Sequence, residues 1–198
     1  MRDHYSDNSD KIMQYTMYIC GRLDEEIIKK SNDIYEKTSK ILSDIITAET
    51  EDDVKKLLPS YLSSLKEVNS FLKKSINSIE KVAKSLIDSG ADESDVKNAI
   101  EASRDLINQT IAAYEVEILA VKESIRLLDN SDYTEAFGTE DVNKKVLNKV
   151  KNLLRTSHAK SSKLMKMIGT KVVRLIAAIK VSVRSKIKEM ANKKKESK

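Results

Sequence analysis

Apolar residues recur at spacings of three and four along almost the whole 198-residue chain, and this period constrains the fold more than any other feature. Such spacing places apolar side chains on one face of an α-helix. Only four glycines and one proline interrupt the pattern, so the chain holds little material for turns. The sequence therefore predicts an all-α protein whose core consists mainly of Ile, Leu, Val, Ala and Met.

Residues typical of helix ends divide the pattern into four expected helical segments, which cover residues 10–48, 51–88, 92–128 and 139–191. Thr50 and the acidic run after it are typical of a helix N-cap and first turn. Gly90 marks a stop between the second and third segments, and residues 129–138 form the one longer loop. Pro59 falls inside the second segment, where we expect a break between two helices rather than a kink.

The apolar faces of these segments suit packing against one another. In the first segment the face runs through Met13, Met17, Cys20 and Leu23, and in the second it includes Tyr61. Short connections between long amphipathic helices favour antiparallel neighbours. We therefore expect an elongated antiparallel bundle of four long amphipathic helices, the last one longest and basic. An oligomeric coiled coil is the competing architecture, because several faces keep near-heptad spacing.

The expected organisation along the chain has three parts. Residues 1–9 form a flexible N-terminus, residues 10–163 the helical bundle, and residues 164–198 a basic amphipathic helix and Lys-rich tail that continue the fourth helix. The first residues lack the apolar stretch of a signal peptide, and no run of about 18 apolar residues occurs. The single Cys20 fits a reducing compartment. These features predict a cytoplasmic protein or a virion component.

The formal net charge of +5 conceals a strong partition. Residues 1–143 hold 18 Lys and Arg against 29 Asp and Glu, which gives −11. Residues 144–198 hold 18 Lys and Arg against only Glu189 and Glu196, which gives +16. Solvated helices usually mix both signs, as the first three segments do. This asymmetry indicates a polyanionic partner or an oppositely charged protein neighbour.

A helical wheel of the last segment separates an apolar arc from a cationic face. Seven cations on or beside that face are the candidate phosphate contacts: Lys163, Lys166, Lys171, Arg174, Lys180, Arg184 and Lys188. No aromatic residue follows Phe137, so this helix has no platform for stacking bases of a single strand. The absence of aromatic anchors also counts modestly against a membrane surface. Duplex nucleic-acid backbone is therefore the favoured partner, ahead of an anionic membrane.

The sequence assigns no catalytic residue, metal ligand, cofactor or small-molecule substrate. A carboxylate-bridged di-metal bundle needs Glu-x-x-His pairs, and none occurs. His158 stands beside Arg155 and Lys160 and is predicted to lie on the helix surface. The four glycines are isolated from one another, so no phosphate-binding loop is present. We expect a non-enzymatic binding protein, with a self-assembling or adaptor bundle, including a homo-oligomer, as the alternative.

Overall fold

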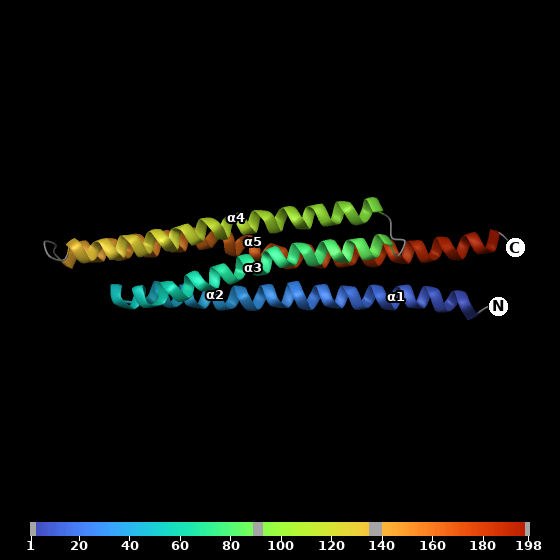
Figure 1. The fold of residues 1–198 in the computed structure, drawn as a ribbon, viewed down its shortest axis with the longest axis horizontal. Helices are drawn as coiled ribbons and strands as arrows, with labels where there is room; N and C mark the ends of the chain where they lie inside the picture. Colours follow the sequence, from blue (N-terminus) through green and yellow to red (C-terminus); the bar gives the residue numbers. More distant parts are fainter. Residues whose placement is uncertain (1–2, 89–92, 135–139, 197–198) are drawn as a thin grey trace. The chain divides into compact units, whose positions relative to one another are not determined.

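The spacing of apolar residues by three and four corresponds to helices over nearly all of the residues that the structure describes. The structure, a computed structural model, describes residues 3–88, 93–134 and 140–196. Its elements are α1 (Asp3–Leu23), the π-helix η1 (Asp24–Lys29), α2 (Lys30–Thr47), α3 (Glu51–Asp88), α4 (Glu93–Thr134) and α5 (Glu140–Glu196) (Figure 1). All regular secondary structure in these residues is helical, which confirms the all-α class.

Four helical runs are present, as expected, although several bounds differ. The elements α1, η1 and α2 follow one another directly and form the first run, which begins at Asp3 rather than near residue 10. The helix α4 continues to Thr134, so the predicted start of a loop at Asp129 is wrong. The rest of that loop, residues 135–139, and the predicted stop at residues 89–92 lie outside the described residues. At 57 residues α5 is the longest helix, as predicted.

The predicted break at Pro59 is wrong, because α3 continues through this residue. A proline inside a helix removes one backbone hydrogen bond and crowds the preceding turn, at a cost of about 3 kcal/mol. Leu58 and Tyr61 on either side of it are both fully buried. Their packing holds the two turns in one helix and offsets that cost. The predicted start of this helix is confirmed, since Thr50 Oγ1 accepts the backbone N–H of Asp53 at 3.2 Å.

The chain divides into two compact units, and each contains a stretch of all four helical runs. Unit 1 comprises residues 1–30, 74–107 and 167–198, and unit 2 comprises residues 31–73 and 108–166. Within each unit, consecutive stretches run in opposite directions (Figure 1). The predicted division between a bundle and a basic extension from residue 164 stays a prediction.

The cores follow the predicted apolar faces closely along α3 and less closely along α1. Along α3 the buried face includes six fully buried side chains: Val54, Leu58, Tyr61, Leu65, Val68 and Leu72. In α1, Met17 was expected inside but is 50% exposed, and Thr16 is buried in its place. The Thr16 hydroxyl donates to the Ile12 carbonyl oxygen at 2.8 Å, which removes the penalty for burying it.

No helix within residues 3–88, 93–134 and 140–196 combines the length and the hydropathy needed to cross a bilayer.

Candidate functional site

The seven cations predicted to contact a polyanion all lie on α5. Five of them are exposed: Lys163, Lys166, Arg174, Arg184 and Lys188. Lys171 and Lys180 are half-buried. On the opposite face of the helix, Leu175, Ile179 and Val183 are buried in the core. The apolar arc and the cationic face expected from the sequence are therefore both present.

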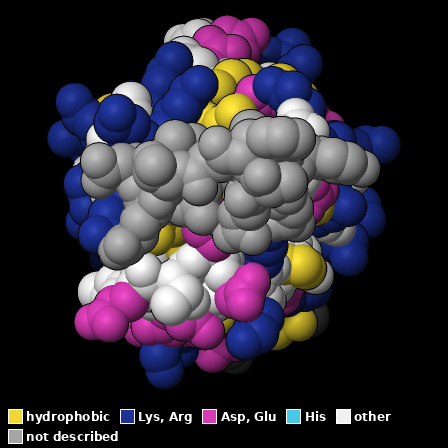
Figure 2. All heavy atoms as spheres, turned by 90° about the vertical axis from the view of Figure 1, so that its left-hand side faces the viewer, with side chains coloured by type: hydrophobic (Ala, Val, Ile, Leu, Met, Phe, Trp, Pro, Cys, Tyr) yellow, Lys and Arg dark blue, Asp and Glu magenta, His cyan; other side chains and the backbone are white. Residues whose placement is uncertain are grey.

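The two units share these cations unequally. Lys163 and Lys166 belong to unit 2, and the other five belong to unit 1. By sequence, unit 1 contains 20 Lys and Arg against 15 Asp and Glu, whereas unit 2 contains 16 of each. Figure 2 views the end of the molecule at which α3 begins, and there Lys and Arg side chains are interspersed with Asp and Glu. The excess positive charge of the chain is a property of unit 1.

Most described cations of α5 in unit 1 form no ion pair with a described acidic side chain. Among the described side chains from residue 167 onward, the one ion pair made by a cation of α5 joins Lys186 to Glu189 at 3.8 Å. Some exposed cations elsewhere in this unit are paired: Lys97 and Arg104 lie 2.7 and 3.5 Å from glutamate oxygens. Apart from Lys186, the described α5 cations of this unit therefore present charge that no carboxylate of the described chain pairs with.

Aliphatic side chains lie among the exposed cations. At 100° per residue, Arg174, Arg184 and Lys188 fall within an arc of about 80°. Val181 falls inside this arc and Val173 lies about 20° beyond its edge. They are 63% and 52% exposed, respectively. The outer face of α5 is therefore a mixed surface of charge and aliphatic carbon, which the division of the wheel into two arcs did not predict.

Lys166 differs from the other candidate contacts because it has a partner within the protein. Its Nζ lies 5.0 Å from the ring centroid of Tyr35, a cation–π distance. A hydrogen bond with Lys166 is the main cause that lowers the pKa of Tyr35. Lys166 is thus tied to unit 2 and is a weaker candidate for a phosphate contact than the cations of unit 1.

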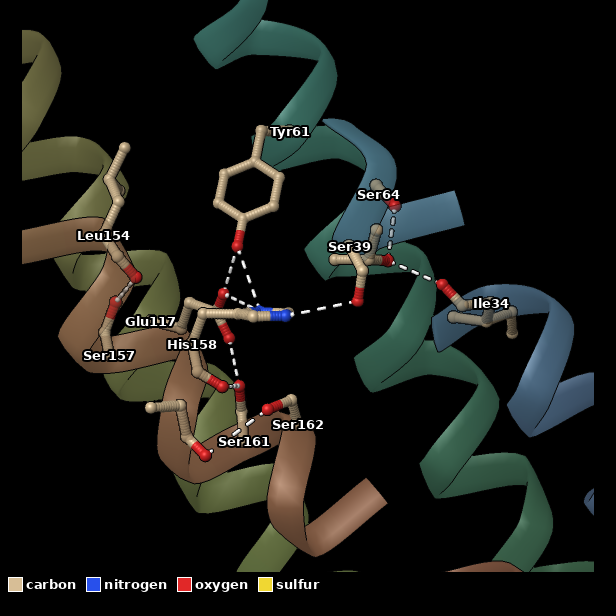
Figure 3. A network of polar contacts seen from close by, with 12 residues as sticks. Ile34, Ser39, Tyr61, Ser64, Glu117, Leu154, Ser157, His158, Ser161 and Ser162 are labelled. Carbon is tan, nitrogen blue, oxygen red and sulfur yellow. Dashed lines mark hydrogen bonds and ion pairs between the residues drawn. The ribbon is translucent and has the colours of Figure 1, made fainter. Parts of the chain in front are cut away.

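A buried polar network lies in unit 2 and centres on Glu117 of α4 (Figure 3). The Glu117 side chain is fully buried. Its carboxylate accepts hydrogen bonds from the hydroxyls of Tyr61 and Ser161 and from Nδ1 of His158, which lies 2.8 Å away. Three donors thus surround one buried carboxylate, which is how a buried charge avoids a large desolvation penalty.

His158 extends this network to α2. A carboxylate can only accept, so the Nδ1 proton of His158 points to Glu117, and Nε2 shares a hydrogen bond with the Ser39 hydroxyl at 3.3 Å. The ring also stacks on Tyr35, with centroids 6.5 Å apart and an angle of 15° between the planes. Burial raises the pKa of Tyr61, and the adjacent Glu117 charge raises it further. Side chains from α2, α3, α4 and α5 are therefore joined at one level of the unit.

The prediction that His158 lies on the helix surface is wrong, because only 9% of the residue is exposed. The sequence signal was its position four residues after Leu154 and three before Ser161, both of which are buried. Glu117 was not singled out at all, although it lies between Tyr114 and Val121 on the apolar face of α4. The charged neighbours of His158 along the chain indicate a surface position, whereas the helical spacing places it on the same face as two buried residues.

The order Ser39, His158, Glu117 has the hydrogen-bond sequence of a nucleophilic triad, but the surroundings lack the rest of that chemistry. Acyl transfer needs N–H donors aimed at a developing oxyanion. Ser39 lies in the interior of α2, where backbone N–H groups bond to carbonyl oxygens one turn earlier. No cluster of three or more His, Cys, Asp and Glu suited to a metal ion occurs in the part of the chain that the structure describes. The network is best suited to fixing the four helices in register.

A groove of about 300 Å³ lies between α1 and α3 in unit 1. Tyr15, Tyr18 and Arg22 line one side of it, and Lys81 and Val82 line the other. Both tyrosines are large side chains that remain substantially exposed, at 44% and 63%. The sequence showed these residues only as members of two amphipathic helices, so no signal indicated that they share a groove.

No protein family model, curated protein or solved structure matches this chain.

Proposed function

We propose that this chain is a non-enzymatic polyanion-binding protein, and that the cations of α5 in unit 1 contact the phosphate backbone of duplex nucleic acid. The observation that carries the proposal is the row of α5 cations that no carboxylate of the described chain neutralises. Phosphate contacts of this kind provide sequence-independent affinity, since each releases condensed counterions from the nucleic acid.

The spacing of the exposed cations suits a row of phosphates. Arg174 and Lys188 are fourteen positions apart, which corresponds to about 21 Å along a helix. Successive phosphates of one strand advance by about 3.4 Å along a duplex. The three exposed cations therefore extend over roughly six base pairs. Half-buried Lys171 and Lys180 lie at the edges of this row and add to its field.

Anisotropy of a labelled blunt duplex of about 20 base pairs, titrated at several salt concentrations, tests the proposal. The logarithm of the binding constant should fall linearly with the logarithm of salt concentration, with a slope of about −0.9 for each phosphate neutralised. The double variant Arg174→Gln, Arg184→Gln should make that slope shallower by about 1.8. Absence of salt-dependent binding by the wild-type protein would overturn the proposal.

A matched control is available in the same unit. The double variant Lys97→Gln, Arg104→Gln removes the same amount of charge from exposed helix positions that are paired with glutamates. Its salt slope should stay within experimental error of the wild type. Equal effects of the two double variants would mean that net charge alone, and not the face of α5, determines binding.

An anionic membrane surface is the second candidate, and the exposed Val173 and Val181 favour it. Aliphatic side chains beside cations are the composition of a helix that lies in a lipid interface. Flotation with vesicles of anionic lipid, compared with vesicles of neutral lipid, tests this alternative. Binding to anionic vesicles that is lost in a Val173→Ser, Val181→Ser variant, together with no binding to duplex, would replace the nucleic-acid proposal.

Self-assembly remains the third candidate. Val116 and Leu119 are exposed aliphatic residues three positions apart on α4 in unit 2, at 60% and 62% exposure. Sedimentation equilibrium in the absence of nucleic acid distinguishes a monomer from a discrete oligomer. An oligomer that is indifferent to added duplex would favour an assembly role.

A further inference from the structure

The tertiary structure supplies the aromatic platform that α5 lacks. No aromatic residue occurs in α5, which is why its sequence favours duplex backbone over a single strand. Folding places α1 in the same unit as the basic half of α5, and α1 carries Tyr15 and Tyr18 beside a groove. Positive charge and exposed aromatic rings are thus brought into one unit from opposite ends of the sequence.

The groove has the composition of a site for a planar, polar, anionic ligand. Tyr15 and Tyr18 are three positions apart, lie on one face of α1 and are 44% and 63% exposed. Arg22 follows one turn later on the same wall, and Lys81 stands on the opposite wall. A volume of about 300 Å³ is at the lower end of the range for small-ligand pockets. One nucleotide is a ligand of that size class.

The polar groups favour a nucleotide over a purely apolar occupant. Arg22 donates through Nε to Glu26 Oε1 at 2.8 Å and through Nη2 to the same oxygen, an interaction that holds the guanidinium beside the groove. The Glu26 carboxylate is an acceptor suited to the amino group of a base. The Lys81 ammonium is a point charge suited to phosphate. An acyl chain would leave these groups without suitable partners.

We infer that this groove holds one unpaired nucleotide, with its base stacked on Tyr18 and Tyr15 and its phosphate beside Lys81. The inference deepens the proposed function and depends on it for the remaining phosphate contacts along α5. It predicts that the preferred target is a duplex with a single-stranded overhang rather than a blunt duplex.

Competition between blunt and overhang-bearing duplexes of equal duplex length provides the test. Wild-type protein should bind the overhang substrate about tenfold more tightly, because stacking of one base accounts for roughly that factor. Tyr18→Leu keeps apolar bulk but removes the aromatic face, so it should abolish the preference. Tyr18→Phe keeps the face and should retain it. Leu119→Ala, a change at an equally exposed position in unit 2, serves as the control.

The outcomes separate failure of the inference from failure of the proposed function. The groove assignment is overturned if the wild-type protein binds the two substrates with equal affinity. The α5 proposal still stands in that case if the double variant Arg174→Gln, Arg184→Gln makes the salt dependence of binding shallower. An overhang preference that survives Tyr18→Leu also overturns the groove assignment. Absence of salt-dependent binding to either substrate overturns the proposed function. Titration with a nucleoside monophosphate then tests the groove alone, and saturable binding lost in Tyr18→Leu would support it.

Discussion

Removal of the Glu117 carboxylate should destabilise unit 2 strongly. Glu117→Ala leaves the hydroxyls of Tyr61 and Ser161 and the Nδ1–H of His158 without their acceptor in a buried site. Each of the three stranded buried donors costs about 1–3 kcal/mol. Hydroxyl rotation and a change of histidine tautomer relieve part of this penalty. We therefore expect the free energy of unfolding to fall by about 3–5 kcal/mol.

Urea unfolding followed by circular dichroism measures this loss, and the same helix offers a matched control. Glu115→Ala removes an identical side chain from an exposed position of α4, and surface changes of this kind alter stability by about 0.5 kcal/mol or less. Agreement of the two variants within that range would refute the reasoning, because it would mean that the carboxylate contributes no more when buried among three donors than in water.

A second variant tests the physical cause of the loss. The fourfold substitution Glu117→Met, Tyr61→Phe, His158→Leu, Ser161→Ala removes the carboxylate and all three donors together. If stranded donors account for the destabilisation, this protein should be more stable than Glu117→Ala, because it leaves none of those three donors unpaired. A fourfold variant less stable than Glu117→Ala would show that attraction within the network outweighs desolvation.

The remaining predictions concern single side chains. Burial raises the pKa of Tyr61, so its contribution to stability is complete well below pH 10 and is lost as pH rises further; wild-type protein should lose about 1 kcal/mol more than Tyr61→Phe between pH 10 and 11, measured by urea unfolding. Burial raises the pKa of the Cys20 thiol, so a thiol reagent at pH 8 should label it slowly in native protein and rapidly in denaturant. Lys166→Met should raise the pKa of Tyr35 in an NMR titration and change duplex affinity less than Arg174→Met does. The Tyr114 hydroxyl is buried without a hydrogen-bond partner among the described groups, so Tyr114→Phe should leave stability unchanged or raise it by about 1 kcal/mol, in contrast to Tyr61→Phe.

Local properties of the chain were sufficient to predict the helices and the nature of α5. The three-to-four period and the scarcity of glycine and proline determine helical runs, because each residue's helical face depends only on its near neighbours. The N-cap at Thr50 follows from the same short-range geometry. The arc of Leu175 and Ile179, opposite a face of Arg174 and Arg184, is likewise a property of one helix.

The spacing of apolar residues does not show which of two adjacent residues is buried when both fit the helical pattern equally well. Thr16 and Met17 both continue a spacing of three or four to Cys20, and hydropathy favoured the methionine. The fold buries the threonine, whose hydroxyl is satisfied by the carbonyl oxygen one turn earlier. Pro59 is a related case, since local propensity indicates a break, whereas burial of the residues around it keeps α3 continuous.

Only the tertiary structure determined which side chains meet across helices. Glu117 and His158 are 41 positions apart, and each is polar, so neither indicated a core position when its own segment was considered alone. Their burial becomes favourable only when α3 and α4 supply the hydroxyl and carboxylate partners that replace water. The groove beside Tyr18 arises in the same way, from two helices separated along the chain. The spacing of apolar residues determined the helices, and local composition determined the charge of α5. Packing determined the polar core and the aromatic groove, because contacts between distant residues are not encoded in local spacing.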